Sequence, residues 1–383
     1  MKFSLDVASP NTGKIAHVVG DTVPIAGVAW LTNARLVYPK LEPGPPFKDF
    51  NLWTIDVNRN TGEPRGKPKR LTQWTGFNIH WLSASSDGKV LAFVREDSQT
   101  DVYVSRLEAG GVRMTVPQRL TLDDHDDNAT AWMPDNRTVL FESNRSGEMH
   151  VYRQSIDSPS AELVIGGPDQ QYQPRIAPGG QWLLYLQIRR PLPKQNARLM
   201  RMPLAGGGSA EEVLVVKGAA QSFQCSRAAG GACVLNELSG QERVVSLFDP
   251  ATGSSREITR NPMDVGDAAI SRDGKHIAFA TGRPRNHIRI LTVDGKAERE
   301  VVVNGVSRLM GLDWSADGES FLCGDVAETE SSVLRVEPDG TSQVLWRQSG
   351  NHDIWAVPSA DGKYVAIHGA TESANVWMVR NPG

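Results

Sequence analysis

Three histidines and the acidic residues beside them are the side chains of this sequence that could hold a metal ion. The histidines are His80, His125 and His352, and the neighbouring carboxylates are Asp123, Asp124, Asp126, Asp127 and Asp353. Imidazole and carboxylate groups together can make a metal site. No close spacing such as His-x-x-x-His accompanies them, so a metal site would require the fold to bring distant segments together.

Two interpretations of these side chains stay open. In the first, they bind a ligand or a metal ion at the mouth of a channel, and the ligand-binding residues are His80, Asp126, Asp127, His352 and Asp353. In the second, the acidic run 123–127 caps a turn and solvates a loop, while His80 packs beside Trp81. Metal content of the purified chain, and its loss in His80→Ala, separates the two.

Cys225 and Cys233 are placed symmetrically about the stretch 226–232, a degenerate copy of the hairpin turn rich in alanine and glycine. If that stretch is a hairpin turn, the two cysteines lie opposite each other on paired strands, which predicts a disulfide bond. The alternative is two reduced cysteines that pack as small apolar residues. Cys323 has no such partner and is predicted to be a buried thiol. A disulfide would indicate an oxidising compartment.

A repeated β-hairpin positions these residues. Its pattern is an apolar strand, a tight turn with Asp-Gly at the tip and a second apolar strand, as in 271–279, 312–322 and 359–367. Weaker copies complete a series whose tips lie near residues 33, 87, 135, 179, 230, 273, 317 and 361. A period of about 44 residues is typical of a four-stranded propeller blade.

The series predicts an all-β chain in which residues 1–383 form a single domain, an eight-bladed β-propeller of four-stranded antiparallel blades. Seven blades is the alternative. The last blade shows only three strands, ending at 376–379, and the segment 14–19 has the pattern of the missing one. We therefore expect the N-terminal strand to close the ring. The surplus strand 3–7 suggests a segment of a longer parent.

Composition excludes several classes of function. The net charge of −3 lacks the basic excess of a nucleic-acid-binding protein. No apolar run approaches the roughly 20 residues that span a bilayer, so no membrane span is expected in this chain. Asp6 interrupts any signal-peptide core at the start. The chain taken as complete would be cytoplasmic, whereas a membrane-anchored parent would place it outside the cytoplasm.

Motifs of the common propeller-associated enzymes are missing. The segment 305–309 has a serine after Gly-Val but lacks the second glycine of a nucleophile elbow, and no kinase motif is found. The sequence therefore predicts no enzyme and no cofactor. The alternative that remains is a metal-dependent carbohydrate-active lyase or hydrolase with its site at the channel mouth.

Several stretches carry a family resemblance, among them 51–57, 141–147, 312–322 and 373–381. With them the chain resembles the TolB-type, WD-repeat-like propeller and, more narrowly, the C-terminal propeller of bacterial receptor-type serine/threonine kinases and winged-helix regulators. The resemblance implies a non-catalytic sensor or scaffold within a larger signalling protein. Its partner would be an unknown protein or a small-molecule ligand at the propeller face, bound by a monomer.

Overall fold

The computed structural model describes residues 3–9, 13–21, 27–42, 49–189, 197–262, 266–350, 352–380 and 382, and almost all of its regular structure is β-strand. The predicted all-β class is confirmed. The chain divides into two compact units. Unit 1 consists of Met1–Ser98 and Glu372–Gly383, and unit 2 of Gln99–Thr371. Two long strands, β8 (Val90–Glu108) and β32 (Tyr364–Arg380), contribute a part to each unit.

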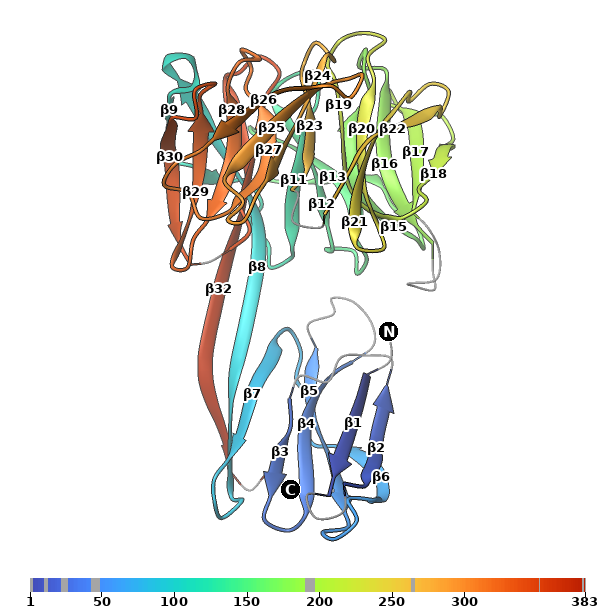
Figure 1. Ribbon diagram of the computed structural model, residues 1–383, viewed down its shortest axis with the longest axis vertical. Helices are drawn as coiled ribbons and strands as arrows, with labels where there is room; N and C mark the ends of the chain where they lie inside the picture. Colours follow the sequence, from blue (N-terminus) through green and yellow to red (C-terminus); the bar gives the residue numbers. More distant parts are fainter. Residues whose placement is uncertain are drawn as a thin grey trace. The chain divides into compact units, whose positions relative to one another are not determined.

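Unit 2 is built from four-stranded antiparallel sheets, most of which take their strands in chain order (Figure 1). Five such sheets consist of β11 (Asp127–Trp132), β12 (Thr138–Ser143), β13 (His150–Ser155) and β14 (Glu162–Ile165); β15 (Gln170–Ile176), β16 (Trp182–Ile188), β17 (Arg198–Pro203) and β18 (Glu211–Val215); β19 (Ala219–Cys225), β20 (Cys233–Ser239), β21 (Glu242–Phe248) and β22 (Ser255–Pro262); β23 (Ala268–Ile270), β24 (His276–Thr281), β25 (His287–Thr292) and β26 (Ala297–Val302); and β27 (Leu309–Trp314), β28 (Phe321–Val326), β29 (Glu330–Val336) and β30 (Ser342–Ser349).

A sixth sheet, the closing sheet, joins the two ends of unit 2. Its order is β31 (Trp355–Pro358), β32, β8 and β10 (Gln118–Arg119), and β9 (Arg113–Met114) also pairs with β8 after a short 3-10 helix, Ala109–Gly111. The innermost strands contact one another in the order β11, β15, β19, β23, β27 and β31, and β31 contacts β11. The described part of unit 2 is therefore a closed ring of six sheets.

The predicted count of eight blades is not confirmed. The hairpin tips at 135, 179, 230, 273, 317 and 361 belong to the ring, whereas those at 33 and 87 lie in unit 1. Unit 1 contains β1 (Phe3–Ala8), β2 (Ile15–Asp21), β3 (Ala29–Leu31), β4 (Arg35–Leu41), β5 (Phe50–Val57), β6 (Pro64–Arg70) and β7 (Asn78–Ala84). Strands β3 to β6 form its four-stranded sheet.

Closure by the N-terminal strand was the wrong prediction. Strand β2 pairs with β1, and the strand beside β32 is β8. The residues from Val94 to Thr100 include no glycine or proline. Because nothing there breaks the strand, β8 runs on past its first hairpin and supplies the neighbour that β32 needs.

Turn glycines and tryptophans fix how adjacent sheets of the ring meet. Gly253 and Gly340 have φ of +74° and +88°, and a Cβ on either would collide with a backbone carbonyl of the preceding sheet, that of Val213 or Val302. Only glycine meets both demands. On the inner side, the indole N–H of Trp132 donates to the carbonyl of Val357 at 2.8 Å, which joins β11 to the closing sheet.

We expect residues 99–371 to fold without the rest of the chain, because they contain five whole sheets of the ring and the parts of β8 and β32 that belong to unit 2. Expressed alone, this segment should give an all-β circular dichroism spectrum and one cooperative thermal transition. Residues 120–371, which lack strands β8, β9 and β10 of the closing sheet, are the matched comparison and should lose the cooperative transition. If the two segments show the same thermal transition, the closing sheet does not hold the ring together.

Candidate functional site

The acidic run 123–127 is paired with arginine. Asp127 is fully buried, and its two carboxylate oxygens accept bonds of 2.9 and 3.0 Å from Nη2 of Arg145. The same Nη2 lies 3.0 Å from Asp123, whose carboxylate also contacts the ring of His125 at 3.0 Å. Asp126 accepts a bond of 3.1 Å from the amide of Asn144. These contacts favour the structural interpretation of the run.

The other predicted residues have partners outside that run. His80 is on β7 in unit 1, with its imidazole 3.5 Å from a Glu96 oxygen. Asp353 contacts Arg308 at 3.2 Å. The backbone N–H of His352 donates to the Ser331 hydroxyl at 2.9 Å. Among the residues described, no group of three or more His, Cys, Asp and Glu side chains is arranged to hold a metal ion.

Cys225 ends β19 and Cys233 begins β20, where the two residues are direct partners in the antiparallel register. Their sulfur atoms are joined in a disulfide bond. Cys323 is a free, buried thiol, and burial raises its pKa. The disulfide closes the turn that carries Ser226 and Arg227, and Cys225 lines the cavity described next.

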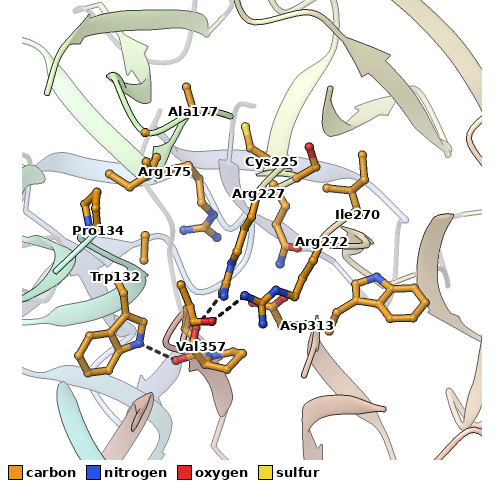
Figure 2. A pocket seen from close by; sticks show the side chains of 18 of the residues that line it. Trp132, Pro134, Arg175, Ala177, Cys225, Arg227, Ile270, Arg272, Asp313 and Val357 are labelled. Carbon is orange, nitrogen blue, oxygen red and sulfur yellow. Dashed lines mark hydrogen bonds between the residues drawn. The ribbon is translucent and has the colours of Figure 1, made fainter. Parts of the chain in front are cut away.

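A cavity of about 370 Å³ opens at the hairpin-tip end of the channel, lined by the innermost strands and their turns. Three arginines and one aspartate contribute its charged groups: Arg175 on β15, Arg227 and Arg272 on turns, and Asp313 on β27. Figure 2 shows the three arginine side chains extending into one space, with Asp313 beside them. A second cavity of about 160 Å³ shares Arg175 and Asp313 with the first.

β-Bulges turn two of these side chains toward the channel. The register of β15 against β16 shifts between Tyr172 and Arg175, and that of β27 against β28 shifts between Met310 and Asp313. A bulge inserts an extra residue and re-aims the side chain that follows it. Arg175 and Asp313 each stand directly after such a shift.

Backbone carbonyl oxygens of other sheets hold the three guanidinium groups in place. Nη2 of Arg227 donates to Pro358 at 2.9 Å, across the ring on the closing sheet. Nη2 of Arg272 donates to Ala360 at 2.6 Å, and Nε of Arg175 donates to Phe223 at 3.1 Å. Because these acceptors are neutral, the bonds fix the side chains without neutralising them. Carboxylates further away offset part of the charge: Glu142 and Asp267 act on Arg175, and Asp361 acts on Arg227.

Electrostatically, the site has an excess of positive charge. Burial raises the pKa of Asp313, and the nearby guanidiniums of Arg227 and Arg175 oppose that shift. Burial also lowers the pKa of Arg175 and of Arg227, although an arginine stays protonated in proteins. Within the described residues, no carboxylate lies within ion-pair distance of Arg175, Arg227 or Arg272.

The sequence prediction did not include this arginine cluster, although a signal for it existed. Arg227 and Arg272 directly follow Ser226 and Ser271, the serines at which their hairpin turns begin. The last repeats have alanine there, for example Ala360. Since Arg227, Arg272 and Ala360 all line the cavity, this variable position faces the channel mouth.

Comparison with known proteins supports the fold. No family model matches the sequence. An uncharacterized protein of Agrobacterium fabrum is 25% identical over 139 residues, which cover 36% of this chain and 44% of the relative. The Tol-Pal system protein TolB of Francisella tularensis is 25% identical over 169 residues, 43% of this chain and 35% of the relative.

A solved structure, the putative TolB from Agrobacterium tumefaciens, superposes with a TM-score of 0.57 at 16% identity and covers 72% of this chain and 99% of that one. The chain has a TolB-like β-propeller fold. It spans less than half the length of the two curated relatives. The narrower resemblance of this TolB-like chain to receptor-kinase and winged-helix propellers stays a prediction. Among the described residues, no helix is long and apolar enough to cross a membrane.

Proposed function

We propose that the TolB-like propeller is a non-catalytic module that binds a protein segment or a small molecule at the mouth of its channel. The observation that carries the proposal is the cavity of about 370 Å³ on which turns of several sheets converge. Ligand pockets of proteins have volumes in this range, with a mostly apolar lining and a few fixed polar groups. Here the fixed groups are the guanidiniums of Arg175, Arg227 and Arg272.

A binding role suits the chemistry of the lining better than catalysis. The cysteine that lines the cavity, Cys225, is engaged in a disulfide and has no free thiolate for nucleophilic attack. Asp313 lies beside Arg175, Arg227 and Arg272, so its carboxylate serves to orient these side chains electrostatically. The alternative, a metal-dependent lyase or hydrolase, would need histidine and carboxylate ligands, and Asp123 and Asp127 are engaged by Arg145.

The proposal extends to the parent protein. A sensor or scaffold of this kind would be one segment of a longer signalling protein, anchored in a membrane and exposed outside the cytoplasm. The disulfide between Cys225 and Cys233 supports that location, because disulfides persist in oxidising compartments. Fractionation of the native source, followed with an antibody to this chain, tests it.

Selection of displayed peptides on the purified chain tests the binding role, with Ala360→Trp as the channel-blocking variant. Ala360 lines the cavity at a turn, so a large ring there should obstruct the mouth. Ala210→Trp, at an exposed position before β18, is the matched control. Peptides that bind the parent should bind the control equally and Ala360→Trp at least about tenfold more weakly. Equal binding to all three proteins would contradict the proposed site, and the absence of any enriched peptide would exclude a protein segment as the ligand.

A further inference from the structure

We propose that the ligand of this channel is an organic carboxylate with an apolar body, whose carboxylate is held by Arg227, Arg272 and Arg175. This inference rests on the proposed function and names the chemical class that the site selects. The carboxylate can belong to a free small molecule or to a peptide, and the experiment below distinguishes these two sources.

The first support is the charge of the cavity. The charged groups that line it are three guanidiniums and one carboxylate, that of Asp313, while Glu142, Asp267 and Asp361 act on the arginines from outside the lining. A bound anion would therefore meet more positive than negative groups at the cavity wall. Arg175 and Arg272 are half-buried, and charges in a partly enclosed cavity attract an anion more strongly than the same charges on an open surface. The channel therefore favours an anionic ligand in a chain whose net charge is −3.

The second support is that the donors are already positioned. Arg227 donates to the carbonyls of Pro358 and Ser359, and Arg272 donates to those of Ala316 and Ala360. A guanidinium has five N–H donors in a rigid plane, and a carboxylate accepts two of them side by side. In the described structure, the carbonyl bonds of Arg227 use two of its nitrogens, so N–H groups remain for a ligand. Because these side chains are already held in place, little conformational entropy would be lost when the ligand binds.

Apolar groups beside the arginines indicate the rest of the ligand. The cavity is also lined by Trp132, Met133, Pro134, Ile176 and Val357. These side chains can contact a hydrocarbon or aromatic body but offer little to a fully hydrated ion. Asp313 also disfavours a polyphosphate, because its carboxylate would repel several closely spaced negative charges. An apolar monocarboxylate satisfies both parts of the lining.

The experiment compares two probes on the full chain by isothermal titration calorimetry. The probes are 4-phenylbutyrate and its uncharged analogue 4-phenylbutyramide, which differ in charge but hardly in shape. We expect the carboxylate to bind at least about tenfold more tightly than the amide. Arg227→Gln and Arg272→Gln should each weaken carboxylate binding about tenfold. Arg256→Gln is the matched control, because Arg256 also donates to a backbone carbonyl, that of Val293, but does not line the cavity.

Asp313→Asn is a control for variants that lose binding only because they misfold. It removes the competing negative charge, so carboxylate affinity should rise several-fold, a result that a damaged fold would not produce. A peptide with a free C-terminal carboxylate is then compared with its amidated form. This comparison tests whether the bound carboxylate can belong to a polypeptide. Preference for the free peptide over 4-phenylbutyrate indicates a protein partner, and the reverse preference indicates a small molecule.

Two failures can be told apart. If carboxylate and amide bind equally and both are lost in Ala360→Trp, the channel is the binding site and the anionic class is wrong. If carboxylate binding persists unchanged in Ala360→Trp, the proposed site itself is wrong. No carboxylate binding at about 10 mM, or unchanged binding in both arginine variants, also overturns the inference.

Discussion

Arg145→Met should lower the free energy of unfolding by about 3–5 kcal/mol, because it leaves the buried carboxylate of Asp127 without its counter-charge. Asp127 is fully buried and receives two bonds from this guanidinium. The guanidinium carbon also lies 4.8 Å from the ring centre of Tyr152, so packing is lost together with charge. Urea denaturation at neutral pH measures the change.

Two controls show whether the buried charge is the cause. Arg153→Met removes an exposed arginine, 2.8 Å from Glu162, and should cost less than about 1 kcal/mol. Asp127→Asn combined with Arg145→Met should recover part of the loss, because no fully buried charge is then left unpaired and the Asp123 carboxylate, which also loses Arg145, is partly exposed. A loss below about 1 kcal/mol for Arg145→Met alone would mean that Asp127 does not depend on this partner.

The loss should also depend on pH. Burial raises the pKa of Asp127 above its ordinary value, so ionisation of this carboxyl opposes folding. Protonation removes that penalty. The stability difference between Arg145→Met and the parent should therefore shrink as the pH is lowered through the raised pKa of Asp127. A difference that stays constant between neutral and acidic pH would point to lost packing alone.

Reduction of the bond between Cys225 and Cys233 should lower stability by about 2.5 kcal/mol, the entropy expected from opening so short a loop. Thermal melts with and without a reductant measure the effect. The double variant with alanine at both positions should melt like the reduced parent. It should also bind a channel ligand more weakly, because the bridged turn carries Arg227 into the cavity.

Thiol titration of the denatured, unreduced protein checks the bond directly. One free thiol is expected, that of Cys323. Cys323→Ala serves as the control, because it should keep the full dependence on reductant while its titratable thiol disappears. Three thiols in the parent, or melts that ignore the reductant in every variant, would contradict both the bridge and the extracytoplasmic location inferred from it.

Local turn chemistry explains which parts of the fold could be predicted from sequence. The hairpin at Asp273 is specified by its own residues, since Gly274 has φ of +75° and the Asp273 carboxylate accepts the N–H of Lys275 at 3.1 Å. Such signals reveal where hairpins lie but not which sheet each one joins. The hairpins at 33 and 87 carry similar signals and belong to unit 1, so counting tips overestimated the ring.

The candidate site was harder to predict for a different reason. An arginine on a turn is ordinarily solvated, and Arg227 and Arg272 become cavity residues only when sheets distant in sequence face them. The acidic run resembled a set of metal ligands because its partner is distant in sequence. Arg145 lies in the turn after β12, beyond the reach of any local motif. The spacing of residues in the sequence shows which charged side chains are near one another along the chain. Which of them are paired with an opposite charge depends on how the sheets assemble.

The closing sheet has a consequence for the order in which the protein is made. Strand β8 and strand β10 leave the ribosome early, but β31 and β32, with which they form one sheet, are synthesised more than 200 residues later. Until β32 is synthesised, the edge of β8 that pairs with it stays unpaired, and unpaired strand edges favour mispairing and aggregation. Ring formation is therefore a late, long-range step, and stalled or truncated translation products should depend strongly on chaperones.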